Sequence, residues 1–114
     1  MYNIVLGRET YEIVLLEKLM RFEWDPDKFQ ENIKKHKVSF REAKTIFLDK
    51  HMIRWSDDEH TNYNATEDRF YALGKSIYNN LLLVCFCERY GDTIRIYSAR
   101  KADKEEKEDY YASY

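Results

Sequence analysis

The stretch from Leu81 to Ala102 most constrains what this chain can fold into, because two strand patterns follow each other across a tight turn. Leu81 to Cys87 is apolar without interruption, which is the pattern of a strand buried on both faces. Tyr90, Gly91 and Asp92 form the turn, where Gly91 is free to take a positive φ. We therefore expect an antiparallel hairpin at the centre of the fold.

The second strand of this hairpin carries one arginine in an unexpected position. From Thr93 the sequence alternates, with Ile94, Ile96 and Ser98 on one face. In a regular strand Arg100 would lie on the same face as Ile94 and Ile96, although it is charged. Either the strand ends or bulges before Arg100, or its guanidinium is buried and requires an anionic partner. We regard Arg100 as the first place to look for function.

Two short helices are predicted before the middle of the chain. Asp25 and Pro26 form a helix start, with aspartate as N-cap and proline at the first helical position. This helix should run to about Lys37. Ser39 followed by Glu42 has the spacing of a capping box, which predicts a second short helix.

Further strand patterns and a final helix complete the expected fold. The strand patterns lie at residues 22–24, 52–55 and 69–74. Asp103 with Glu106 three residues later caps the last helix, whose inner side carries Tyr110, Tyr111 and Tyr114. The expected fold is α+β, a twisted antiparallel sheet of about four to five strands with two N-terminal helices and one C-terminal helix.

Residues 1–19 form a segment that the domain itself does not require. Met20 precedes the first clear core strand, so we expect an N-terminal extension of unknown role followed by a single domain at 20–114. Val14, Leu15 and Leu19 recur at helical spacing and give the extension one apolar side. That side should pack on its own domain or contact a second copy of the chain in a homodimer.

Composition excludes several classes of protein. With only 3 glycines and 1 proline among 114 residues, disorder is not expected. No apolar run is long enough to span a membrane, and charges interrupt the N-terminal stretch where a signal peptide would lie. Cys85 and Cys87 are expected to be reduced core residues, and the histidines have no ligand spacing. We expect a cytoplasmic protein with no metal, no cofactor and no membrane partner.

A set of motifs between Met20 and Tyr110 matches one known family when the motifs are taken together. They are Phe22-Glu23-Trp24-Asp25, Asn32, Lys35-His36, Val38-Ser39-Phe40-Arg41-Glu42-Ala43, Glu67-Asp68-Arg69-Phe70, Leu73-Gly74, the run from Ile94 to Ala102, Glu106 and Tyr110. In combination they resemble the BrnT family, small bacterial toxins of type II toxin–antitoxin pairs. The resemblance covers nearly the whole domain.

The resemblance implies a RelE/ParE-like fold and a ribonuclease activity that halts translation. It also implies neutralisation by a BrnA-like ribbon-helix-helix antitoxin. In that family the toxin–antitoxin complex binds operator DNA through the antitoxin. The implied partners are therefore RNA, an antitoxin and, only through the antitoxin complex, operator DNA.

Four side chains are candidates for metal-independent cleavage of RNA. Arg100 and Arg69 offer guanidinium groups that bind phosphate oxygens bidentately. His36 can transfer protons near neutral pH, and Lys35 beside it can stabilise negative charge. The structural alternatives are a helix-terminal or buried His36, a solvated Lys35, and an ion pair between Arg69 and its acidic neighbours.

Three further side chains are candidates for RNA binding. Arg95 lies on the face opposite the isoleucines together with Tyr97, a ring on which a base can stack. Arg89 lies at the mouth of the hairpin. Glu88 is either a carboxylate base or a partner of Arg95 across the hairpin.

Two other functions are compatible with the sequence. One is a non-catalytic interaction module that binds an antitoxin-like partner, and the other is a toxin on the same fold that targets a protein. The module predicts that the arginines disperse into ion pairs. The ribonuclease predicts that the arginines and His36 converge on one open cleft.

Overall fold

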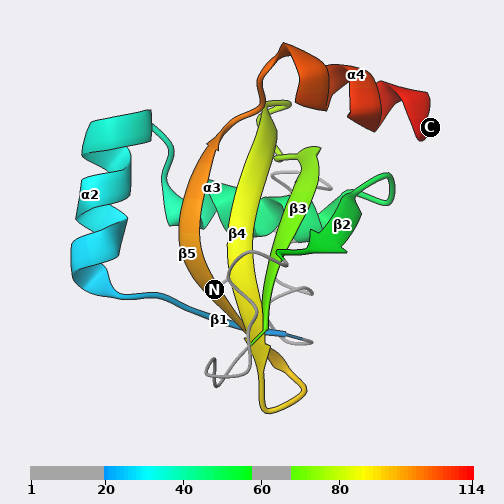
Figure 1. The fold of residues 1–114 in the computed structure, drawn as a ribbon. Coiled ribbons are helices and arrows are strands. Elements are labelled where there is room, and N and C mark those ends of the chain that lie inside the picture. The colour runs from blue at the N-terminus through cyan, green and yellow to red at the C-terminus, as the bar shows by residue number, and fades with distance from the viewer. Residues whose placement is uncertain (1–19, 58–67) are drawn as a thin grey trace, which may run out of the picture.

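The computed structural model describes residues 20–57 and 68–114, which fold into one mixed sheet with helices around it (Figure 1). The order of the strands across the sheet is β1-β5-β4-β3-β2. The strands are β1 (Arg21–Glu23), β2 (Ile53–Ser56), β3 (Arg69–Lys75), β4 (Leu81–Arg89) and β5 (Thr93–Lys101). The helices are α2 (Pro26–His36), α3 (Phe40–Ala43), the 3-10 helix η2 (Lys44–Leu48) and α4 (Lys104–Ala112). The predicted α+β architecture is confirmed, while the prediction for 1–19 concerns residues outside those described.

Local signals set the ends of the first helix. The Asp25 carboxylate accepts a hydrogen bond from the Asp27 N–H at 2.7 Å, as expected of an N-cap. Lys37 has φ 59° and closes α2 in the left-handed conformation. For α3, Ser39 caps the helix by accepting from the Arg41 N–H at 2.9 Å.

The capping box predicted for α3 is not formed. The Glu42 carboxylate instead accepts hydrogen bonds from Ser76 Oγ at 2.7 Å and from Asn80 Nδ2 at 2.8 Å. The turn between β3 and β4 supplies both donors, so a tertiary contact takes the side chain that the local pattern assigned to the cap.

The sheet is antiparallel except at one edge. β1 runs parallel to β5, with Glu23 opposite Arg95. This is the one difference from the expected antiparallel sheet. It brings the acidic end of β1 beside the arginine of β5.

A β-bulge in β5 explains the position of Arg100. Ile96 pairs with Phe86 and Ser98 pairs with Cys85, so Tyr97 is an extra residue between the two pairs. The bulge shifts the alternation by one residue. Ala99 then joins the isoleucines in the core, and Arg100 turns to the other side of the sheet.

One face of the sheet carries most of the core. This covered face lies beneath α3 and η2, which pack behind the sheet in Figure 1. Its fully buried residues include Phe40, Ile46, Leu82, Val84, Phe86 and Ile96. A smaller cluster lies on the opposite face, where Tyr110 of α4 packs on Leu73, Leu81 and Leu83.

The final helix begins as predicted. Asp103 accepts from the Glu106 N–H at 2.8 Å, and Glu106 accepts from the Asp103 N–H at 2.9 Å, which completes a capping box. Tyr110 is fully buried, but Tyr111 and Tyr114 are exposed, so only one of the three tyrosines predicted to face inward does so. Among the described helices, none is long and apolar enough to cross a membrane.

Candidate functional site

The face opposite α3 and η2 is only partly covered, and we call it the open face. α4 lies over one end of it (Figure 1). Next to α4 is a pocket of about 330 Å³. Its lining residues are His36, Trp55, Tyr71, Leu83, Cys85, Ser98, Ala99, Arg100 and Glu106. Two of the four candidate catalytic residues, His36 and Arg100, therefore line one pocket.

Asn32 explains why these two residues meet. Its amide donates to the Ala99 carbonyl at 2.7 Å and accepts from the Ala99 N–H at 3.1 Å, which fixes α2 along the edge of β5. Arg100 follows Ala99 in the strand. His36 lies four residues after Asn32 and so on the same side of the helix. The buried Asn32 also donates to the Val38 carbonyl at 2.9 Å, which fixes the end of α2.

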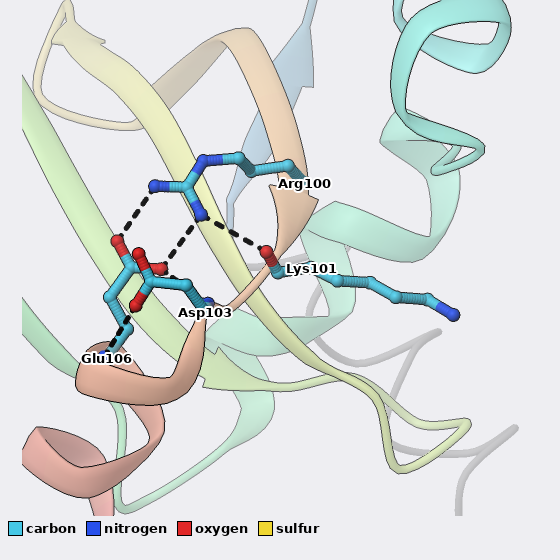
Figure 2. Close-up of polar contacts among 4 residues, drawn as sticks. All are labelled: Arg100, Lys101, Asp103 and Glu106. Atoms are coloured by element: carbon cyan, nitrogen blue, oxygen red, sulfur yellow. Dashed lines mark hydrogen bonds and ion pairs between the residues drawn. The ribbon is translucent and has the colours of Figure 1, made fainter.

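Arg100 is held by Glu106 in a bidentate ion pair (Figure 2). Nη1 donates to Oε1 and Nη2 to Oε2, both at 2.8 Å. The side chains of Arg100 and Glu106 are 38% and 18% exposed, so the pair is open to solvent on the arginine side. The hydrogen bonds to Glu106 raise the pKa of Arg100 further, and the guanidinium is always charged.

The pocket contains residues that the sequence did not mark as functional. The sequence predicts Glu106 as a helix cap and as a family motif residue, and its carboxylate both caps α4 and binds Arg100. Trp55 comes from the edge strand β2 and is 42% exposed, and Tyr71 comes from β3. In the sequence, Trp55 and Tyr71 are marked only by their alternating positions in two short strand patterns. Burial raises the pKa of the Cys85 thiol to about 11, so the thiol stays protonated.

A smaller pocket of about 150 Å³ adjoins the first and shares His36 and Ser98 with it. Lys35 and Tyr97 line this smaller pocket. His36 therefore lies between the two pockets along α2 and β5, and Lys35 lines the smaller one. Lys35 is exposed, and its ammonium is accessible to an anion.

Arg69 lies on the open face but outside both pockets. Its guanidinium carbon is 4.3 Å from the centroid of the Tyr97 ring, a cation–π contact. The alternative ion pair of Arg69 with its acidic neighbours involves Asp68 and Glu67, of which Glu67 lies outside the described residues. The sequence predicts a catalytic role for Arg69 and an RNA-binding role for Tyr97, and the structure places the two side chains in contact.

Arg95 and Arg89 converge on one carboxylate. Arg95 Nη1 lies 2.7 Å from Glu23 Oε2, and Arg89 Nη1 lies 4.0 Å from the same oxygen. The alternative in which Arg95 pairs with Glu88 is wrong. Cys87 is the residue opposite Arg95, so Glu88 points to the other side of the sheet and binds Arg54 at 2.6 Å.

The open face thus offers groups suited to a phosphodiester. Arg100 can bind phosphate oxygens, His36 can exchange protons, and the rings of Trp55 and Tyr71 can stack on a base. Within residues 20–57 and 68–114, no cluster of three or more His, Cys, Asp or Glu side chains is arranged to hold a metal ion.

Comparison with known proteins identifies the family. The family model described as "Ribonuclease toxin, BrnT, of type II toxin-antitoxin system" matches residues 24–106. The crystal structure of the Brucella abortus ribonuclease toxin BrnT is similar in fold, with a TM-score of 0.55 and 22% sequence identity. The similarity covers 75% of this chain and 99% of that one. A comparison with curated proteins gives no match. The chain belongs to the BrnT family of ribonuclease toxins of type II toxin–antitoxin systems.

Proposed function

We propose that this chain is an endoribonuclease that cuts RNA without a metal ion, at the pocket between α2, β5 and α4, and so inhibits translation. The observation that carries the proposal is that His36 and Arg100 line the same pocket. One supplies a group for proton transfer and the other a phosphate ligand. The proposal rests on this pair together with the family's ribonuclease activity.

Cleavage requires charge stabilisation at phosphorus. The 2′-oxygen attacks the phosphorus while the bond from phosphorus to the 5′-oxygen breaks, and negative charge develops on the equatorial oxygens. The fork of Arg100 suits these oxygens, and Lys35 adds positive charge in the adjoining pocket. Glu106 occupies the fork of Arg100, so binding of a phosphate would exchange one anion for another.

Cleavage also requires two proton transfers. One group must take the proton of the 2′-hydroxyl, and one must give a proton to the leaving 5′-oxygen. An imidazole titrates near neutral pH and can perform either transfer, so we assign one of them to His36. Glu106 is the one carboxylic side chain among the described residues that line the pocket, but three hydrogen bonds from Arg100 and the Asp103 N–H hold it.

The other candidates would bind RNA next to the scissile bond. Tyr97 lines the smaller pocket, and Arg69 lies against its ring. We assign them a role in holding a neighbouring nucleotide, by stacking and by charge. Arg89 and Arg95 are already neutralised in part by Glu23, so we expect them to contribute less.

The test is RNA cleavage by the purified full chain in EDTA, comparing wild type with Arg100→Lys. Lysine keeps the charge but loses the fork, so cleavage should fall by about 10²-fold or more. Arg21→Lys, at an exposed position on β1, is the matched control and should cut like wild type. Circular dichroism checks that each variant is folded. Loss of cleavage in EDTA by wild type would contradict metal independence.

A second candidate is a non-catalytic module that binds an antitoxin. The ion pairs of Arg89, Arg95 and Arg100 favour it, because paired arginines are less available to RNA. This candidate predicts no RNA cleavage by folded wild type under any buffer condition. A cleavage signal that disappears in Arg100→Lys and persists in Arg21→Lys would exclude it.

We further propose that the partner is a BrnA-like ribbon-helix-helix antitoxin, and that operator DNA is bound only through the complex. Membership of a type II toxin family supports a protein antitoxin. Co-expression with such an antitoxin, followed by size-exclusion chromatography, tests it. A complex that elutes together and no longer cuts RNA is the expected result.

A further inference from the structure

A second hollow on the molecule is lined by cationic and amide side chains, and we call it the basic pocket. It has a volume of about 430 Å³ and lies where the β3–β4 turn, the end of β5 and α4 meet (Figure 1). Its polar lining residues are Lys75, Asn79, Asn80, Lys101, Lys107 and Tyr111. Three of them are lysines, and none of the described residues that line it is acidic. A pocket of this kind stands out on a chain whose net charge is −2.

α4 separates this basic pocket from an acidic one. Lys107 and Tyr111 are four residues apart, so they lie on one side of the helix. Glu105 and Asp109 have the same spacing on another side and line a different pocket of about 530 Å³. The polar groups that line this acidic pocket are carboxylates, apart from the indole N–H of Trp55. An anion is therefore attracted to one flank of α4 and repelled from the other.

Exposed aromatic rings continue from the basic pocket. Lys75 Nζ lies 5.1 Å from the centroid of the Tyr111 ring. The Tyr111 ring stacks on Tyr114, with centroids 5.6 Å apart and planes 16° apart. Tyr114 stacks in turn on His51, at 4.1 Å and 24°. Tyr111 and Tyr114 are 50% and 61% exposed, so much of each ring is open to solvent.

We propose that the basic pocket binds the phosphate backbone of single-stranded RNA away from the bond that is cut, while a base packs against the exposed parts of the Tyr111 and Tyr114 rings. Lysines beside exposed aromatic rings are the combination that binds single strands without sequence preference. The amides of Asn79 and Asn80 add hydrogen-bond groups for phosphate or base. The RNA in question is the substrate of the proposed ribonuclease, so this inference rests on the proposed function.

The end of β5 connects this site with the candidate active site. Arg100 lines the pocket that holds His36, and the next residue, Lys101, lines the basic pocket. Figure 2 shows the Lys101 side chain extending away from the Arg100–Glu106 pair. A strand of RNA that crosses the end of β5 would therefore meet both sites.

The test is binding of a fluorescent 2′-O-methyl RNA of roughly 12 nucleotides, followed by anisotropy over a range of salt concentrations. The methyl group blocks the 2′-hydroxyl, so binding is read without cleavage. Each phosphate contact with a single strand contributes about 0.7 to the slope of log affinity against log salt. The Lys101→Gln/Lys107→Gln protein should lose about 1.4 from this slope and bind about tenfold more weakly at low salt.

The charge-matched control is Arg21→Gln/Arg41→Gln. Both arginines are exposed. Arg21 pairs with Thr93, next to the β4–β5 turn, at the end of the sheet opposite the basic pocket. A loss of affinity in the control as large as in the lysine variant would overturn the site, because it would then reflect net charge alone. Tyr111→Leu should weaken binding about tenfold and Tyr111→Phe much less, since phenylalanine retains the ring.

The two proposals fail separately. If wild type cuts RNA but the lysine and control variants bind the oligonucleotide equally, the basic pocket is not a site and the ribonuclease proposal stands. If wild type cuts no RNA yet binding depends on Lys101 and Lys107, the basic pocket stands as a nucleic-acid site and the ribonuclease proposal falls.

Discussion

The two faces of the sheet are made by the same strands, yet they hold different kinds of side chain. On the covered face, Phe86 is fully buried among other rings under η2. On the open face, the neighbouring strand positions carry Arg95 and Arg100, each in an ion pair with a carboxylate. Alternation along β5 therefore buries Ile94 and Ile96 in the core and leaves Arg95 on the open face.

The bulge at Tyr97 keeps Arg100 on the open face. Without it, Arg100 would share the face of Ile94 and Ile96, where a charge has no solvent and no partner. With it, Ala99 fills the core and Arg100 reaches Glu106. The one extra residue in β5 therefore moves Arg100 out of the core and into the pocket that contains His36.

The largest predicted effect is on the covered face. Phe86 contacts the rings of Phe47 and Phe70, with centroids 5.2 and 5.7 Å away. Phe86→Ala should lower the free energy of unfolding by about 3–5 kcal/mol, measured by urea denaturation. Ser98→Ala on the open face should change it by less than about 0.5 kcal/mol. Equal losses in the two variants would contradict the contrast between the faces.

The next prediction concerns Asp49, which connects the η2 side of the molecule to α4. Its carboxylate accepts hydrogen bonds from the Lys75 N–H at 2.8 Å, the Tyr110 hydroxyl at 2.5 Å and the His51 N–H at 2.9 Å. Burial acts to raise the pKa of Asp49, but these hydrogen bonds outweigh it, and the pKa is lowered from 3.8. Asp49→Asn should cost about 2 kcal/mol at neutral pH, measured by urea denaturation.

The sign of the pH dependence follows from the lowered pKa. Because the folded pKa lies below the unfolded one, the carboxylate stabilises the protein fully above about pH 4 and loses this effect as pH falls through the folded value. The difference in stability between wild type and Asp49→Asn should therefore shrink in acid. Asp109→Asn, at an exposed position of α4, should show no such change. A constant difference from pH 7 to pH 2 would exclude the carboxylate as the cause.

A smaller effect is expected at the Arg100–Glu106 pair on the open face. Glu106→Gln keeps a side chain that can complete the helix cap but removes the negative charge from Arg100. We expect a loss of about 1 kcal/mol in unfolding free energy, because the pair is partly exposed. Inorganic phosphate should bind about fivefold more tightly to the freed guanidinium, as measured by calorimetry. Unchanged phosphate affinity would mean that Glu106 does not compete for Arg100.

The smallest effect should be at Glu23. Its side chain is 35% exposed, and the side chain of its partner Arg95 is 23% exposed. Glu23→Gln should cost less than about 1 kcal/mol, and the difference from wild type should narrow in 1 M NaCl because exposed pairs are screened. Thermal unfolding at low and high salt measures both the loss of stability and its dependence on salt. A loss of unfolding free energy that does not depend on salt and exceeds the loss in Glu106→Gln would contradict this prediction.

Local sequence signals predicted much of the fold. Asp25 and Pro26 start α2, Asp103 with Glu106 starts α4, and the apolar run from Leu81 forms the central strand as expected. These features depend on a few neighbouring residues and on groups that the backbone itself leaves unpaired. The sequence motifs also predicted the BrnT family, which the family model confirms.

The partners of the charged side chains were not predictable in the same way. Glu42 looked like a capping residue and binds the β3–β4 turn, and Glu88 looked like a partner of Arg95 and binds Arg54. Glu23 lies opposite Arg95 only because β1 joins the sheet in parallel. Each of these pairs joins residues that are more than 30 positions apart, so no local pattern could specify it.

Helix caps, turns and strand alternation in the sequence predict most of the helices and strands, and the motifs predict the family. The shared pocket of His36 and Arg100 depends on long-range packing, because hydrogen bonds from Asn32 hold α2 at the edge of β5. Only the structure brought Lys75, Lys101 and Lys107 together around α4. The physical reason is that helix caps, turns and alternation act over a few residues, whereas a site is made where distant segments pack.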